Sequence, residues 1–319
     1  MHTGTEFSRN FSAAFSFRHA LNCFGMIRRK MFRLKLPSQT LVLGERTLLM
    51  GVLNVTPDSF SDGGQFLDAP RAIERALAIE SAGADILDIG GESTRPGSST
   101  TPAREELARV LPVLEGLRGR LKIPISIDTQ KVEVAEAAVD AGAQMINDTS
   151  GLRFDPRLAE LAARRCLPLI LMHLRGVPRT MQKAGFARNV LRDVTKGLRK
   201  SLSVAVKAGV AKSQIILDPG IGFGKSFAQN YELLEKLPMM ATLGYPLLVG
   251  PSRKGFLGRT LAREGTPAPP PDRIWGTAAT VTASILNGAH IVRVHDVAEM
   301  VDVARVADCL VNPALRRSL

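Results

Sequence analysis

The feature that most constrains the fold of this chain is an eightfold alternation of short apolar runs with segments of helical spacing. The apolar runs occupy residues 48–53, 86–89, 125–127, 145–146, 169–172, 215–217, 247–249 and 291–294. The intervening segments, such as 71–82 and 131–141, repeat apolar residues every three to four positions, as amphipathic helices do. Short strands that alternate with helices predict a parallel sheet, and eight such units in roughly 270 residues predict a single (β/α)₈ TIM barrel.

Two details bear on this prediction. The segment 131–141 places Val132, Ala135, Ala138 and Val139 on one face, and Gly142 is expected to end the helix because glycine favours that position. The alternative fold is a doubly wound open sheet. It is disfavoured because no G-x-G-x-x-G follows the first apolar run.

Polar side chains follow every predicted strand. In chain order the runs end on Asn54, Asp88, Asp128, Asn147, His173, Asp218, Ser252, and the pair Arg293 and His295. The carboxyl ends of barrel strands form one rim, so these residues are expected to converge on one pocket. Capping of the following helix is the expected role of Asp88 and is also open for Ser252, but capping does not account for all eight ends.

The amino-acid composition excludes several classes of protein. The chain has 319 residues, 45% of them hydrophobic, and contains no apolar run near the roughly 20 residues that span a bilayer, so no membrane segment is predicted. Cys23, Cys166 and Cys309 lie far apart, which argues against a disulfide framework or a zinc site and fits a reducing, cytoplasmic location. The net charge of +12 suits an anionic substrate. Nucleic-acid binding is not expected, since aromatic and basic residues are not interleaved.

The N-terminus differs from the rest. Residues 1–33 are expected to form a basic extension that is disordered or weakly ordered, and 34–319 to form the barrel domain. A targeting peptide, a disordered tail and a start codon placed upstream of Met26 or Met31 all remain open for the extension. Residues 34–43 predict a short β-hairpin with its bend near Pro37 and Ser38.

Three strand-end residues point to a flat nitrogen heterocycle. Asp128, Asn147 and Asp218 supply two carboxylates and an amide, which can pair with a ring N–H and an exocyclic amine of a guanine-like or pterin-like edge. Paired carboxylates also serve glycosidases. The nearby cations, which are Lys254, Arg293 and His295, fit an anionic leaving group better than a neutral sugar.

The loops add anion-binding features. The segment 90–97, GGESTRPG, carries Arg95 on a glycine-rich loop suited to clamping an anion, and Lys254 begins a helix whose N-terminus favours one. The segment 218–225, DPGIGFGK, imitates a P-loop, but Pro219 stands where that motif needs glycine. A nucleoside triphosphatase is therefore rejected. Residues 55–64 are expected to act as a mobile lid. His290 is expected to be structural, and a structural role is favoured over direct chemistry for His173 as well.

Taken together, these motifs resemble the dihydropteroate synthase family from about residue 34 to the C-terminus. The resemblance rests on NVTPDSFSDGG, GGESTRPG, SIDT, Asn147 with Asp148, LMH, DPGIGFGK, SRKG and RVHDV, in that order. It implies a transferase that joins a dihydropterin-methyl diphosphate to 4-aminobenzoate, with release of diphosphate and Mg²⁺ as cofactor, in a homodimer. A pterin-binding paralogue without activity and a pterin-dependent methyltransferase are the alternatives.

The resemblance also implies a role for each matching residue. The pterin would be held by Asp128, Asn147, Asp218 and Lys254, with Met172 and Phe223 lining its slot and Arg293 stacked on it. The diphosphate would be bound by Thr94, Arg95, Arg293 and His295, with Val294 between the last two. Asn54 would bind the metal, and Ser252, Phe60 and Pro96 would frame the aminobenzoate. Asp128, Lys254, Arg95 and Arg293 are the expected catalytic residues.

Overall fold

The computed structural model describes residues 29–56, 69–93, 98, 100–177, 181 and 185–317. Positions 1–28 of the predicted N-terminal extension therefore lie outside the described residues. The boundary between the extension and the barrel domain at residue 33 stays a prediction. Among the described residues, contacts with the barrel already begin at Arg29, which is buried and donates hydrogen bonds to Thr47 Oγ1 and Asp308 Oδ1 at 2.6 and 2.5 Å.

The predicted parallel barrel is confirmed. Its strands are β3 (Leu48–Asn54), β4 (Ile86–Gly90), β5 (Ile125–Asp128), β6 (Met145–Asp148), β7 (Leu169–Met172), β8 (Ile215–Asp218), β9 (Leu248–Val249) and β10 (Ile291–Val294). They are hydrogen-bonded in the order β8-β7-β6-β5-β4-β3-β10-β9. A parallel bridge between Leu217 and Leu247 brings the two ends of this order together, which closes the barrel.

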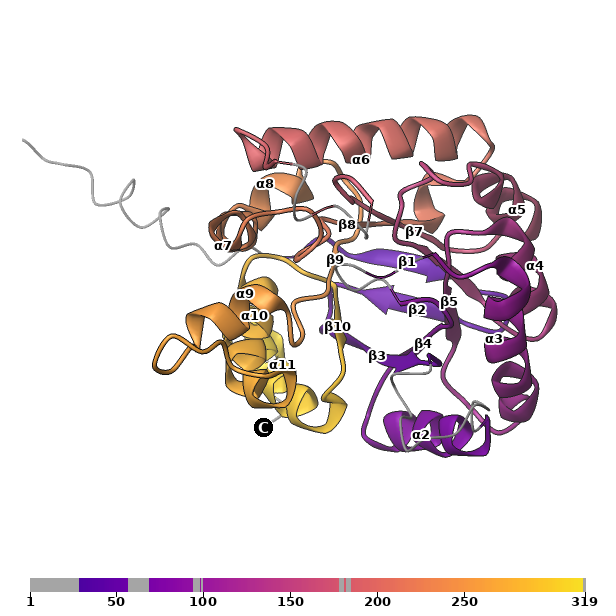
Figure 1. The fold of residues 1–319 in the computed structure, drawn as a ribbon, viewed down its shortest axis with the longest axis horizontal. Coiled ribbons are helices and arrows are strands. Elements are labelled where there is room, and N and C mark those ends of the chain that lie inside the picture. The colour runs from indigo at the N-terminus through magenta and orange to yellow at the C-terminus, as the bar shows by residue number, and fades with distance from the viewer. Residues whose placement is uncertain are drawn as a thin grey trace, which may run out of the picture.

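Helices surround the sheet (Figure 1). They are α2 (Ala69–Ser81), α3 (Ala103–Leu117), α4 (Val132–Asp140), α5 (Arg157–Arg165), α6 (Val190–Lys207), α7 (Phe227–Glu235), α8 (Leu237–Ala241), α9 (Gly255–Thr260), α10 (Ile274–Leu286), α11 (Val297–Val311) and α12 (Pro313–Arg316).

The buried face of α4 is rotated from the predicted one. Val134, Ala135 and Ala138 are buried, whereas Val132 and Val139 are only partly covered. Val134 was missed because two apolar spacings fit so short a helix, and only the neighbouring elements select one of them.

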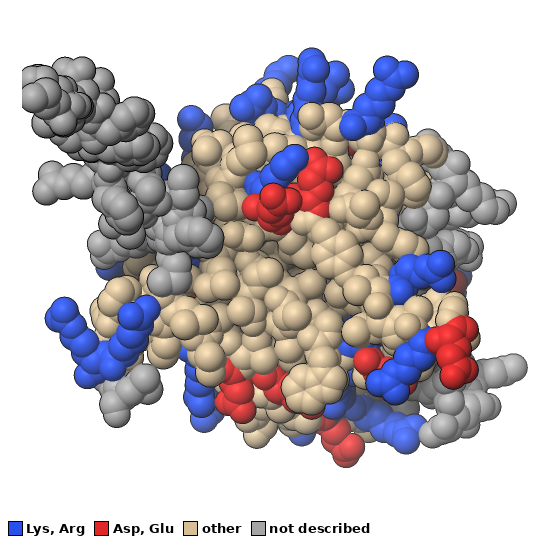
Figure 2. Space-filling model, turned by 90° about the vertical axis from the view of Figure 1, so that its left-hand side faces the viewer, with Lys and Arg blue, Asp and Glu red and all other residues tan. Residues whose placement is uncertain are grey.

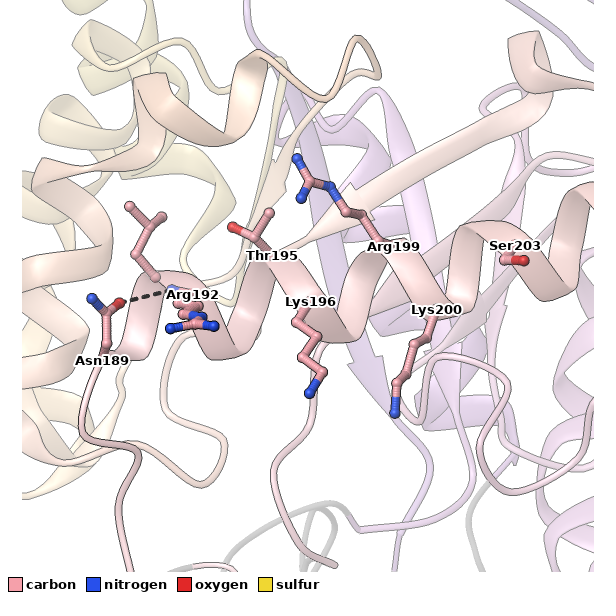
Figure 3. A pocket seen from close by; sticks show the side chains of 8 residues that line it. Asn189, Arg192, Thr195, Lys196, Arg199, Lys200 and Ser203 are labelled. Carbon is pink, nitrogen blue, oxygen red and sulfur yellow. Dashed lines mark hydrogen bonds between the residues drawn. The ribbon is translucent and has the colours of Figure 1, made fainter.

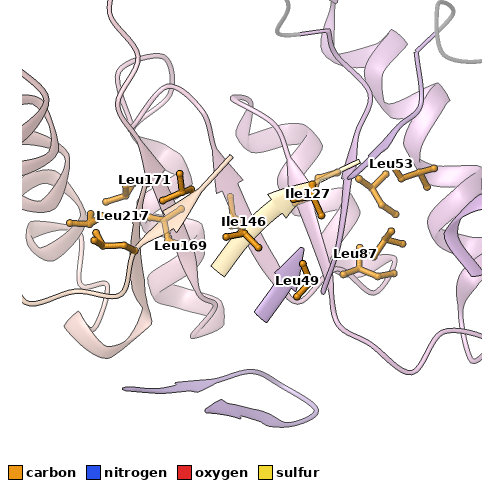
Figure 4. Close-up of a cluster of buried hydrophobic side chains, with 14 of the residues drawn as sticks. Leu49, Leu53, Leu87, Ile127, Ile146, Leu169, Leu171 and Leu217 are labelled. Atoms are coloured by element: carbon orange, nitrogen blue, oxygen red, sulfur yellow. The ribbon is translucent and has the colours of Figure 1, made fainter. Parts of the chain in front are cut away.

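Side chains alternate between two cores, because successive residues of a strand point to opposite faces. Leu49, Leu53, Leu87 and Ile127 point outward and pack beneath the helices (Figure 4). Residues one position away point into the barrel, and the inner cluster is formed by Leu48, Met50, Ile86, Met145, Ile170, Ile216, Leu248 and Ile291. These inner residues lie near the starts of their strands.

The predicted N-terminal hairpin closes that end of the barrel. It consists of β1 (Phe32–Lys35) and β2 (Thr40–Leu43), paired antiparallel. Leu34, Leu36 and Leu43 are buried in the inner cluster. Because apolar side chains fill the end where the strands begin, any ligand has to enter from the end where they finish.

No helix in the described part of the chain is long and apolar enough to cross a membrane.

Candidate active site

Polar side chains replace apolar ones one pleat further along the barrel interior. In β4, Asp88 stands two residues after the inward Ile86, and in β6, Asn147 stands two residues after Met145. The register aligns Asp128 with Asn147, and Met172 with Asp218. The barrel thus changes from an apolar floor to a layer of acids, an amide and Arg293 at the mouth.

Arg293 links two of these acids. Its Nε donates to Asp88 Oδ2 at 2.6 Å and its Nη2 donates to Asp128 Oδ2 at 2.9 Å. Asn147 Nδ2 donates to the same Asp88 oxygen at 3.0 Å. Arg293, whose side chain is 18% exposed, thus ties the acids of β4 and β5 to β10, and Asp88 extends the network to Asn147 on β6.

The interpretation of Asp88 as a helix cap was wrong. Its side chain is 0% exposed and points into the barrel, where it accepts from Asn147 and Arg293. The two-residue spacing from Ile86 could have indicated this, because residues i and i+2 share a face of a strand. Asp88 is thus a site residue that the sequence interpretation missed.

Burial sets the electrostatics of this network. It raises the pKa of Asp128 to about 8, although the Arg293 guanidinium opposes the shift and the Asp88 carboxylate adds to it. Burial alone would lower the pKa of Arg293, but the attraction of Asp88 and Asp128 outweighs it and the pKa rises. Arg293 therefore stays charged, and its attraction keeps the pKa of Asp128 lower than burial alone would make it.

A second cation, Lys254, lies beside the ring of Phe223. Its Nζ is 4.0 Å from the ring centroid, within the range of a cation–π contact. Burial lowers the pKa of Lys254 to about 8, with repulsion from Arg293 in the same direction and attraction from Asp218 and Asp128 against it. As predicted, Lys254 immediately precedes a helix, α9, as its N-cap. Its ammonium and the ring border one side of the mouth.

The loop after β8 holds Asp218 through its own backbone. Gly220 N donates to Asp218 Oδ1 at 2.7 Å, and burial raises the pKa of that carboxyl to about 6. Gly220 has a φ of +69°, and a Cβ there would lie 2.0 Å from the His173 carbonyl oxygen. Only glycine fits this position, which explains the first glycine of the DPGIGFGK motif.

Lys225, the lysine of the DPGIGFGK motif, has a structural role that the sequence analysis did not assign. Lys225 is 2% exposed, and its Nζ donates to the carbonyls of His173 and Phe223 at 3.0 and 2.9 Å and to His173 Nδ1 at 3.1 Å. It thereby joins the ends of β7 and β8 and fixes the backbone that carries Phe223. Burial, reinforced by Lys225, lowers the pKa of His173 to about 2, so this imidazole is neutral.

The β9 and β10 ends are joined in a similar way. Ser252 Oγ lies 3.0 Å from His295 Nδ1 and accepts from His295 N at 3.2 Å. Between the two site residues Ser252 and Lys254, Arg253 adopts a φ of +57° and forms a two-point ion pair with Asp296. Burial, with added repulsion from Arg293, lowers the pKa of His295 to about 3. His295 is therefore a neutral hydrogen-bonding group in this state.

The structure brings most of the predicted residues together. Met172 clusters with Phe223, and Asn54 stands at the end of β3, paired in register with Gly90. Val294 is an exception, because its side chain is buried in the outer core between sheet and helices and only its backbone can face a ligand. His290 is buried and accepts from Leu247 N, as a structural histidine does.

Several predicted residues cannot be placed. Phe60, Thr94, Arg95 and Pro96 lie outside the described residues, as do positions 57–64 of the predicted lid. The first two residues of that lid belong instead to the fixed structure: Val55 and Thr56 are buried, and Val55 N donates to Gly90 O at 2.8 Å.

Comparison with known proteins first identifies the family to which the chain belongs. The model of the pterin binding enzyme family matches residues 50–295, which span all eight barrel strands apart from the start of β3. The chain belongs to this family. Its relatives then narrow the class to the dihydropteroate synthases.

One such relative is the dihydropteroate synthase of Synechocystis, 49% identical over 84% of this chain and 91% of its own length. Another is the solved dihydropteroate synthase of Xanthomonas albilineans with 4-aminobenzoic acid, 42% identical, with a TM-score of 0.81 over 88% of this chain and 98% of that one. A structure of the enzyme from the same organism, in complex with 7,8-dihydropteroate, is 40% identical, with a TM-score of 0.77 over 87% of this chain and 98% of that one.

Proposed function

We propose that this chain condenses a (7,8-dihydropterin-6-yl)methyl diphosphate with 4-aminobenzoate to give 7,8-dihydropteroate and diphosphate. The observation that carries the proposal is the set of acids, amide and cations at one barrel mouth, tied together by Arg293 through Asp88 and Asp128. It is supported by relatives named dihydropteroate synthase that the chain covers over most of their length.

Recognition of the pterin is assigned to the buried acceptors. Asp128, Asn147 and Asp218 offer oxygens to the ring N–H and amino groups, and an analogue that lacks those donors would leave buried acceptors unpaired. Met172 and Phe223 supply the apolar walls, and Lys254 can donate to a ring acceptor. The flat Arg293 guanidinium suits stacking against the pterin ring.

The chemistry requires charge stabilisation more than a nucleophile. When the bond between the pterin methylene carbon and the diphosphate oxygen breaks, the electron pair leaves with the oxygen and the carbon becomes electron-poor. Asp128 in its ionised form stabilises that carbon electrostatically, while Arg293 and His295, together with Thr94 and Arg95, receive the diphosphate. The aminobenzoate nitrogen then forms the new bond to carbon and loses a proton.

Placement of the arylamine is the remaining task. Ser252, with Phe60 and Pro96, is proposed to frame the aminobenzoate, which needs orientation rather than activation. Ser252 is suited to this role because its hydroxyl is already held by His295.

Mg²⁺ is the proposed cofactor, held by Asn54. No group of three or more His, Cys, Asp or Glu residues in the described part of the chain could hold a metal ion. One amide oxygen at the mouth fits Mg²⁺ all the same, because this ion is commonly bound by one or two protein groups together with substrate phosphates and water. When bound, it would offset negative charge on the diphosphate.

A homodimer is proposed through α10 and α11. Trp275 on α10 is 79% exposed, and Val306 and Leu310 on α11 are 66% and 45% exposed, although large apolar side chains usually avoid water. Sedimentation velocity should show a dimer for the full chain and a monomer for Val306→Glu. The matched change Val204→Glu on α6 should leave the dimer intact. A monomeric wild-type protein would overturn the assignment.

A cytoplasmic location is likewise a proposal. Its support is that Cys166 and Cys309, the two cysteines within the described residues, are free thiols.

The direct test of the activity supplies purified protein with the pterin diphosphate, 4-aminobenzoate and Mg²⁺. Diphosphate and dihydropteroate should appear in equal amounts, and omission of aminobenzoate should stop dihydropteroate formation. Pterin binding without turnover would identify a binding paralogue, and methyl transfer to a corrinoid acceptor would identify a methyltransferase. Either result contradicts the proposal.

A further inference from the structure

A second concentration of cations lies outside the barrel mouth, along α6. The Lys and Arg side chains at the upper edge of Figure 2 are level with α6 in Figure 1. Two hollows adjoin this helix, and both include Lys196 and Lys200 in their lining. One runs along the helix surface, where Figure 3 shows Lys196 and Lys200 projecting to one side and Arg199 to the other.

The other hollow is a cavity of about 430 Å³ between α6 and the loops that follow β6 and β7. Its charged lining is Arg153, Arg175, Lys196 and Lys200 against Asp193 alone. His173 also lines it and adds no charge, because burial lowers its pKa to about 2. The cavity is therefore a strongly positive recess, of the size that small-molecule sites have.

The arginines of this cavity are held in place by the backbone. Arg153 Nε donates to the Ser150 carbonyl at 3.2 Å and its Nη2 to the Gly176 carbonyl at 2.8 Å. Arg175 Nε donates to the Gly185 carbonyl at 3.2 Å, and its Nη1 lies 3.2 Å from each carboxylate oxygen of Asp193. Both guanidinium groups retain further N–H donors, and a planar fixed guanidinium is well suited to phosphate oxygens.

The lysines differ from the cations of neighbouring helices. Arg157, Arg164 and Arg165 of α5 each form an ion pair with an acid of α4, namely Glu133, Glu136 and Asp140. Lys196 and Lys200 form no ion pair with any residue that the structure describes. Like charges four positions apart also repel each other on a helix, so an anion between these two lysines would relieve their repulsion.

We propose that this cavity binds a compact polyanion of the phosphate class, such as inorganic diphosphate or a small molecule with two or three linked phosphates. Lys196 and Lys200 supply the charge, and Arg153 and Arg175 supply directed hydrogen bonds. The cavity lies beside the barrel mouth and shares Met172 with it, but the proposed reaction does not require the four cations of the cavity.

Calorimetric titration of the full-length protein at low ionic strength tests the proposal, with inorganic diphosphate and triphosphate as probes and succinate as a doubly charged carboxylate control. Lys196→Glu with Lys200→Glu should weaken phosphate binding by at least about tenfold. The matched pair Arg192→Glu with Arg199→Glu makes the same charge change on the same helix, outside the cavity lining, and should weaken it by less than about threefold.

Equal weakening by the two pairs would mean general attraction to a basic surface, and an unchanged affinity in the lysine variant would place the anion elsewhere. Absence of binding, or equal affinity for succinate, would also overturn the proposal. Turnover shows that the variants are folded, because neither lysine belongs to the proposed active site, and Lys196→Ala with Lys200→Ala replaces the charge reversal if that variant does not fold.

Discussion

Arg293 offers the sharpest test of how the barrel mouth is held together. The change Arg293→Met keeps the length of the side chain and removes its charge, which leaves Asp88 and Asp128 without their shared cation. These carboxylates are 0% and 8% exposed. Removal of one partner from a buried ion pair costs about 3–5 kcal/mol, because the remaining charge has neither water nor a counter-ion. We expect a loss of that size in the free energy of unfolding near pH 8.

The pH dependence follows from the sign of the Asp128 shift. Burial raises the pKa of folded Asp128 from 3.8 to about 8, so its contribution to stability is fully present below about pH 4 and is lost as the pH rises through about 8. Arg293 opposes that shift, and its removal raises the folded pKa further. Both proteins should therefore lose stability at the same rate up to about pH 8, and above that pH the variant should continue to lose stability, so that the difference between the two proteins widens.

Urea unfolding of both proteins at pH 7 and pH 9.5 measures these differences without any substrate. Adding Asp128→Asn to the variant removes one of the stranded charges and should restore part of the loss at pH 9.5. A cost below about 1 kcal/mol, typical of an exposed pair, or a difference that is the same at both pH values, would refute the account of Arg293 as the cation that stabilises these acids.

Four further predictions concern the mouth and its support. Lys254→Ala should lower kcat/KM more than about 100-fold, an effect of roughly 3 kcal/mol, and near-normal kcat/KM would exclude its assigned role. Since Lys254 has a pKa near 8 in the free protein, kcat/KM should fall as the pH rises above about 8, and Lys254→Arg should move that decline to higher pH. Gly220→Ala should destabilise the protein by more than about 1–3 kcal/mol, as its Cβ would meet the His173 carbonyl at 2.0 Å; thermal unfolding at an unchanged temperature would contradict this. Lys225→Met should raise KM for the pterin substrate and lower the unfolding temperature, because Phe223 and the β7 end lose a common donor, whereas a change in kcat alone would indicate direct chemistry.

The order of the elements could be read from the sequence because it depends on local patterns. Apolar runs of four or so residues, helical spacing between them and a polar residue after each run are properties of neighbouring positions. They were sufficient to predict a closed barrel, the N-terminal hairpin and a mouth that gathers Asp128, Asn147 and Asp218. The family motifs supplied the substrates, which no local pattern could identify.

Only the tertiary structure decided which way particular side chains point and what they contact. Asp88 has the sequence context of a helix cap, yet the twist and register of the barrel turn it inward to Arg293, about two hundred positions away in the chain. Lys225 has the context of a phosphate-binding lysine, yet burial between two strand ends turns it into a structural donor. The sequence by itself determined the barrel and the composition of its rim. Charge pairing across the barrel, and the pKa values that burial imposes, arise only when distant residues meet away from water.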